Sequence, residues 1–225
     1  MSAGRDVMHT VGRWLSVIVP VAVMMLFWSS PLLWPLKIFV VLLHELSHLL
    51  ALVLTGGHPS AISLSPEQGG LMVGTGGWRL LVLNAGYLGS LIWGLALLAI
   101  ANRTRMVPIF LRVMGLGLGL ATVIWMRPVL GFGFFYGLAV GILMFALGAR
   151  ISAGAGAALL RVVGLFSCLY AVIDIQLDVL TGRGGVSDAS MLADLTHIPA
   201  MVWGVGWCLL ALTILYLFRR TVIGG

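Results

Sequence analysis

Charged residues are scarce in this chain. Only 9% of its 225 residues are Asp, Glu, Lys or Arg, whereas 60% are hydrophobic, and the mean hydropathy is +1.11. Soluble domains carry about 25% charged residues, so the composition excludes an ordinary soluble domain. The apolar residues form runs close to the roughly 20 residues that cross about 30 Å of hydrocarbon. We therefore expect a multi-pass integral membrane protein in a lipid bilayer, and we place it in the plasma membrane.

Cysteine is also rare, and most basic residues lie outside the apolar runs. The two cysteines, Cys168 and Cys208, lie in apolar runs and form neither a disulfide framework nor a zinc site by themselves. The net charge of +6 comes from thirteen Lys and Arg against seven acids. Most of the basic residues lie at the chain ends or between apolar runs, as lipid headgroup anchors do. We therefore expect no nucleic-acid partner.

The apolar runs predict an all-α, polytopic helical membrane protein with about seven transmembrane helices, six to eight at the limits. We find no internal repeat and no soluble module, so residues 1–225 are expected to form a single integral membrane domain. Lys and Arg are shared almost evenly between alternate loops, so the positive-inside rule gives no orientation. The expected spans are residues 15–34, 36–54, 80–101, 107–126, 129–148, 159–180 and 199–218.

The connection after the second span is polar and rich in glycine. Its segment AISLSPEQGGLMVGTGG alternates apolar and polar residues on both sides of Pro-Glu-Gln-Gly-Gly. This pattern favours a short β-hairpin, although an irregular loop is an equal alternative. If a hairpin forms, main-chain groups around Leu71 to Gly76 are candidates for holding an extended substrate segment.

Three of the seven acids lie at membrane depth. Glu45 is near the middle of the second span, and Asp174 and Asp178 are in the last half of the sixth. An ionisable group in the hydrocarbon core is expensive, and by default it marks a functional site with a partner. These three residues therefore require a chemical explanation.

The sequence HELSH supplies one for Glu45. His44 and His48 are four residues apart, so on a helix their imidazoles lie on one face and can share a metal ion. In the H-E-x-x-H arrangement two histidines bind zinc, and the glutamate takes a proton from a water molecule that the zinc activates. The alternative is that these residues hydrogen-bond within the bundle and bind nothing, which is costly for buried polar groups.

A catalytic zinc site takes three protein ligands, so a third must come from elsewhere in the chain. The histidines lie about 12 to 18 Å from the start of their span, and Asp174 lies about 10 Å inside the end of the sixth. Depth therefore favours Asp174. Asp178, one turn further on, is an alternative ligand or a hydrogen-bonding support. Asp188 qualifies only if its segment re-enters the membrane. A purely structural role for Asp174 and Asp178 would be pairing with Arg161 or Arg183.

The sequence resembles the site-2 protease family of intramembrane zinc metallopeptidases. The resemblance rests on HELSH at 44–48, the Gly-rich segment after it and NAGYLGSLIWG at 84–94. A smaller branch of the family is indicated by YAVIDIQLDVL at 170–180 and SDASMLADLTHIPAMVWGVGW at 187–207. Better-known members take their third ligand from an Asp-Gly pair in a motif that opens with Asn-Pro, and this chain contains neither pair.

The resemblance implies that His44 and His48 bind one zinc ion per chain and that Glu45 is the catalytic base. The expected activity is hydrolysis of peptide bonds in or near transmembrane segments of other membrane proteins. Asn84 is a candidate donor to the developing oxyanion, or alternatively a helix-packing residue. Competing interpretations are a proton or metal-ion transporter and a non-proteolytic metal-binding membrane protein. The lack of repeated halves argues against the transporter.

Overall fold

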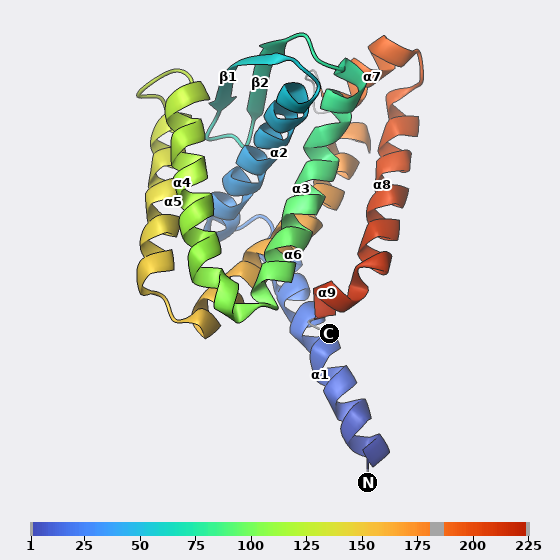
Figure 1. Ribbon diagram of the computed structural model, residues 1–225. Helices are drawn as coiled ribbons and strands as arrows, with labels where there is room; N and C mark the ends of the chain where they lie inside the picture. Colours follow the sequence, from blue (N-terminus) through green and yellow to red (C-terminus); the bar gives the residue numbers. More distant parts are fainter. Residues whose placement is uncertain (1, 181–186, 224–225) are drawn as a thin grey trace.

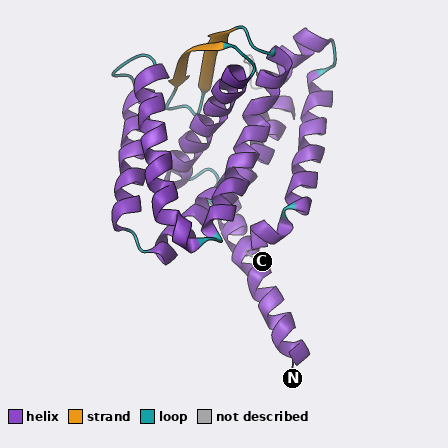
Figure 2. Cartoon of the chain, viewed as in Figure 1, coloured by secondary structure: helices purple, strands orange, loops and turns teal. Residues whose placement is uncertain are grey.

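Helices make up almost all of the structure outside one hairpin (Figures 1 and 2). The computed structural model describes residues 2–180 and 187–223, with side chains over 11–176 and 187–223. Its elements are α1 (Ser2–Leu26), α2 (Trp34–Leu54), β1 (His58–Leu64), β2 (Gly70–Thr75), α3 (Arg79–Ala101), α4 (Val107–Trp125), α5 (Phe132–Arg150), α6 (Ala153–Leu180), α7 (Asp188–Thr196), α8 (Ala200–Leu217) and α9 (Arg219–Ile223).

Six helical segments of the described chain are long and apolar enough to cross a membrane. They correspond to α2, α3, α4, α5, α6 and α8. The protein is therefore all-α and polytopic, as the composition predicts. The remaining predicted span is the one nearest the N-terminus, at residues 15–34. In this region the described chain has a shorter apolar helix, Val11–Leu26 of α1.

The first apolar run ends earlier than predicted because its last residues leave the helix. The chain turns after Leu26, and a short 3-10 helix occupies Pro31–Leu33. The Ser30 side chain caps this turn by accepting a hydrogen bond from the Leu32 backbone N–H. Proline at position 31 suits a new helical start, because its missing N–H is not needed there. In Figure 1, α1 projects from the bundle at the end opposite the hairpin.

Helix α2 occupies the centre of the fold. It packs against α3, α6 and both strands, and most of its side chains are buried, among them Ile38, Val40 and Leu43 at 0% exposure. Helix α3 approaches α6 closely at Gly94, where an added Cβ would lie 2.8 Å from the Gly164 carbonyl oxygen. Small residues permit such approaches between helices in lipid. Helix α2 is the most deeply buried of the six apolar segments in the described chain.

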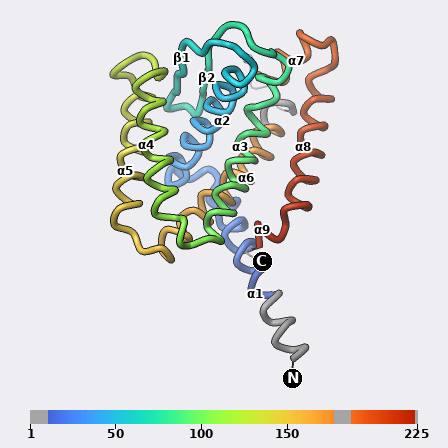
Figure 3. Tube along the Cα trace, viewed as in Figure 1, coloured from blue at the N-terminus to red at the C-terminus, as the bar shows by residue number. Residues whose placement is uncertain are grey.

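The predicted hairpin is confirmed. Strands β1 and β2 pair antiparallel, with Ile62 opposite Met72, and lie beside α2 (Figure 3). The indole Nε1 of Trp34, at the start of α2, donates to the Pro66 carbonyl in the hairpin turn at 2.8 Å. The outer edge of β1 is also covered, because the Arg127 backbone N–H donates to the Ile62 carbonyl at 2.8 Å. The hairpin is thus held at its turn and along β1.

Helix α7 was not predicted, because its residues follow a polar segment and are too few to span a membrane. Ser187 caps it in a capping box with Ser190, in which each side chain bonds the other residue's backbone N–H. Leu192 and Ala189 are buried and belong to a cluster that includes Trp207 of α8. Helix α7 lies at the same end of the bundle as the hairpin (Figures 1 and 3).

Candidate metal centre

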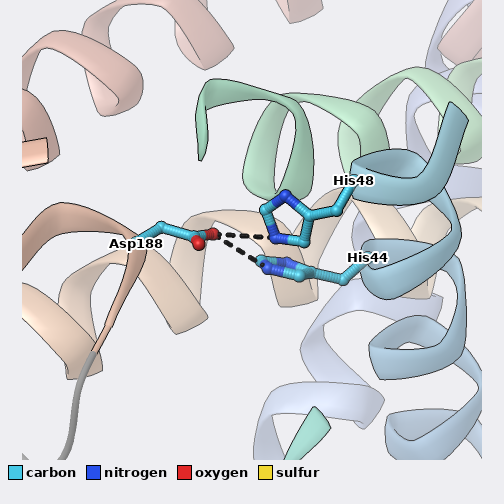
Figure 4. A group of neighbouring side chains, drawn as sticks. All are labelled: His44, His48 and Asp188. Atoms are coloured by element: carbon cyan, nitrogen blue, oxygen red, sulfur yellow. Dashed lines mark hydrogen bonds and ion pairs between the residues drawn. The ribbon is translucent and has the colours of Figure 1, made fainter. Parts of the chain in front are cut away.

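Two imidazoles and one carboxylate meet between α2 and α7. His44 and His48 lie one turn apart on α2, with ring centroids 4.7 Å apart. The Nε2 atom of each lies 3.1 Å from Oδ2 of Asp188, the first residue of α7 (Figure 4). His48 and Asp188 are buried. One potential ligand atom from each of the three residues lies within 4.8 Å of the others.

The capped start of α7 holds Asp188 in this position. Ser187 and Ser190 fix the first turn, and Ala189 and Leu192 anchor the helix against α3 and α8. Burial alone would raise the pKa of the Asp188 carboxyl, but the two adjacent imidazoles outweigh burial and hold that pKa below its usual range. The group is therefore a carboxylate at neutral pH, which is the form that binds metal ions.

Contacts behind the metal-facing atoms orient both imidazole rings. Nδ1 of His48 lies 2.7 Å from the Val82 carbonyl oxygen, and a carbonyl can only accept a hydrogen bond. Nδ1 therefore carries a proton, and Nε2, on the side of Asp188, is the atom that can bind a metal ion once it is deprotonated. The ring of His44 packs edge-on against Tyr87, with centroids 4.9 Å apart and an interplanar angle of 85°. Ligating histidines in metal sites are commonly oriented by such outer contacts.

Gly86 of α3 leaves the space in which the two histidines meet. A Cβ at this position would overlap Nε2 of His44 and would lie 2.6 Å from Nε2 of His48. Gly86 belongs to the segment NAGYLGSLIWG, on which the family resemblance partly rests. The structure explains why glycine occupies this position, because only a residue without a side chain fits beside the two nitrogen atoms.

Gly86→Ala is therefore expected to weaken zinc binding by roughly 10- to 100-fold, the range seen when the support of a ligand is lost. The measurement is zinc affinity of the purified protein by competition with a chromogenic chelator. Gly206→Ala on α8 is the matched control, because a Cβ there meets nothing within 4 Å. Equal zinc affinity of the Gly86 and Gly206 variants would contradict this geometry.

Glu45 lines the same cavity and lies against the hairpin. It is buried, and a Cβ at Gly70 of β2 would lie 2.8 Å from its carboxyl carbon. The cavity has a volume of about 620 Å³, and the two histidines, Glu45, Asp188 and the residues of β2 line it. The cluster and the edge of β2 therefore face one space.

The aspartates favoured by depth take different places. Asp174 lines the cavity, but among the described residues the three-ligand cluster contains Asp188 in its stead. The side chain of Asp178 lies outside the described residues. The geometry thus favours Asp188, whose segment does return to the site, over Asp174. The available sequence clue was Ser187 followed by Asp188, since serine is a preferred N-cap and an acid is common in the first helical turn.

Asn84 has both ends of its amide engaged. Its Nδ2 donates to the Leu80 carbonyl at 2.8 Å, and its Oδ1 accepts a hydrogen bond from the Trp207 indole at 2.7 Å. It is not among the residues that line the cavity. The contact with α8 favours the helix-packing role over substrate binding.

The donor set fits a zinc ion. Ligand atoms about 2.0 to 2.2 Å from a tetrahedral zinc lie about 3.3 to 3.6 Å apart, and the two His–Asp separations of 3.1 Å are a few tenths of an ångström shorter than this range. Two imidazoles and a carboxylate leave one position open, as in catalytic rather than structural zinc sites. His44, His48 and Asp188 therefore satisfy the chemistry and spacing of a three-ligand site.

Comparison with known proteins assigns this chain to a family. Residues 17–218 match the family model described as Peptidase M50B-like, which covers most of the chain. Neither the comparison with curated proteins nor the comparison with solved structures finds a match. The matched region includes α2, the hairpin and α7, and so every residue of the cluster.

Proposed function

This chain belongs to the Peptidase M50B-like family, within the site-2 protease family, and we propose that it is an active intramembrane zinc metalloprotease. The family is one of membrane-bound zinc metallopeptidases, and the six apolar helices make this member a multi-pass integral membrane protein. The proposed substrates are membrane proteins cut in or near a transmembrane segment, and the proposed location is the plasma membrane.

The convergence of His44, His48 and Asp188 on one cavity with Glu45 is the observation that carries this proposal. Asp188 comes from a different helix, 144 positions from His44, so the cluster is a product of the fold. Burying two imidazoles and one carboxylate costs less free energy when a bound cation neutralises the charge of the carboxylate. We assign His44, His48 and Asp188 as ligands of one zinc ion.

Each residue then has a defined task in peptide hydrolysis. A zinc ion bound by the cluster supplies Lewis-acid activation of water and of the scissile carbonyl. The Val82 carbonyl and the Tyr87 ring keep the two imidazoles in their ligating orientation. Glu45 takes a proton from the attacking water and delivers it to the leaving amine. Its buried position beside the cluster keeps this proton transfer apart from bulk solvent.

The edge of β2 is the proposed support for the substrate main chain. A transmembrane helix hides its peptide groups in its own hydrogen bonds, so it must unwind before hydrolysis. An extended segment can then pair with a strand edge. Because β1 is covered by Arg127, the edge of β2 that faces the cavity is the one suited to this role.

Cleavage in proteoliposomes tests the proposal. The purified protein is reconstituted with a panel of single-span test peptides, and products are identified by mass spectrometry. We expect cuts in or near the transmembrane segment that stop with a zinc chelator and return when zinc is restored. A zinc-loaded protein that cuts none of the panel, yet moves protons or divalent ions across the vesicle membrane, would favour a transporter.

A further inference from the structure

The register of the hairpin determines where the polar groups of Met72 point. In an antiparallel ladder, opposed residues either bond each other or both point away. The Ile62 carbonyl points away from β2, because it accepts from Arg127 on the far side of β1. Its partner Met72 therefore directs its own N–H and C=O away from β1. Met72 lines the cavity, so these groups belong to the edge that would receive a substrate segment.

Glu45 lies at this edge. Its side chain lies against β2 and lines the same cavity as Met72, whose N–H points out of the ladder. Gly70, two positions earlier on the same strand face, makes the approach possible, since a Cβ there would collide with the Glu45 side chain. The strand edge and the candidate base are therefore in direct contact in the substrate-free protein.

We propose that the Met72 N–H is a shared donor: it holds Glu45 in the free protein, and an extended substrate segment displaces Glu45 when it pairs with β2. The inference rests on the proposed function. A backbone N–H makes one strong hydrogen bond, so a substrate carbonyl and the Glu45 carboxylate compete for it. Substrate binding thereby releases the Glu45 carboxylate from the strand edge.

Hydrogen exchange tests the contact without any need for proteolysis. In the zinc-loaded, substrate-free protein we expect the Met72 amide to exchange at least about 10-fold faster in Glu45→Ala than in the unsubstituted protein. The amides of Leu71 and Val73 point toward β1, where they pair with Ser63 and Ala61, and their exchange rates should not change. An unchanged Met72 rate overturns the proposal and leaves the proposed protease function standing.

Substrate affinity tests the competition. Glu45→Ala and Glu45→Gln are both expected to be unable to cleave, so a fluorescent single-span test peptide reports binding alone. Glu45→Gln keeps an acceptor for the Met72 N–H, whereas Glu45→Ala removes it. We expect Glu45→Ala to bind the peptide about 5- to 10-fold more tightly. Equal or weaker binding by Glu45→Ala contradicts competition at this donor.

Met72→Pro provides the control for the space that alanine opens. Proline lacks the N–H and is tolerated where a strand N–H points away from its partner strand. In the Met72→Pro background the affinity difference between Ala and Gln at position 45 should vanish. If it persists, the difference reflects space, and the proposal fails. Leu71→Pro is the matched variant that removes a ladder bond, and it should lower the melting temperature where Met72→Pro does not.

Discussion

Replacing Asp188 by alanine is expected to lower the zinc affinity of the purified protein by at least about 100-fold. Asp188 contributes one of three proposed ligands, so its loss should exceed the 10- to 100-fold effect typical of residues that only support a ligand. Both histidine nitrogens lie 3.1 Å from its carboxylate, and no other acid belongs to their cluster within the described chain. Chelator competition on detergent-purified protein measures the effect.

Asp174→Ala is the matched comparison, because Asp174 lines the same cavity without belonging to the cluster. It should retain zinc within about threefold of the unsubstituted protein, well inside the loss expected for a ligand. The opposite ranking, with zinc lost from the Asp174 variant and kept by the Asp188 variant, would restore the ligand that helix depth favours. Loss of zinc from both would indicate that the two carboxylates act together.

Glu45→Gln is expected to reduce peptide cleavage by about 100- to 10,000-fold while zinc content stays at one ion per chain. General acid–base catalysis contributes a factor of this size, and an amide cannot take up the proton. The substitution preserves side-chain volume, so the approach of β2 at Gly70 is not disturbed. The measurement pairs single-turnover cleavage of a test peptide with metal analysis of the same sample.

The zinc content separates this result from simple loss of the site. If Glu45→Gln lost zinc along with cleavage, Glu45 would belong with the ligands. If the variant cleaved at the normal rate, the proposed mechanism would be wrong, and a non-proteolytic metal-binding role would gain support. Gly86→Ala gives the complementary case, in which zinc binding itself should fall.

Local patterns predicted most of the fold. The third span was expected at 80–101, and α3 runs from Arg79 to Ala101, because length and hydropathy alone define such a helix. The hairpin was recognised from alternation around a Gly-rich turn. The first span was predicted too long at its C-terminal end, because α1 ends at Leu26 and Ser30 caps a separate 3-10 turn at Pro31–Leu33.

The candidate site, like the fold, was predicted only in part from the sequence. The spacing of HELSH places His44 and His48 on one helical face, so the sequence alone suffices for them. Asp188 was ranked below Asp174 because depth compares only positions along membrane spans, whereas the structure places Asp188 outside them, at the start of α7 and beside His44. The engagement of Asn84 was equally hidden, since its partner Trp207 is 123 positions away. Contacts of this kind depend on tertiary packing.

X-ray absorption at the zinc edge of the purified protein tests the central claim most directly, together with the metal content of the same sample. The account predicts one zinc per chain, with two imidazole nitrogens at about 2.0 to 2.1 Å and oxygen ligands at about 2.0 to 2.2 Å. It also predicts that the two-imidazole signal disappears when His44 and His48 are replaced. A protein that copurifies without zinc and fails to bind it when supplied would contradict the account, as would zinc bound without imidazole.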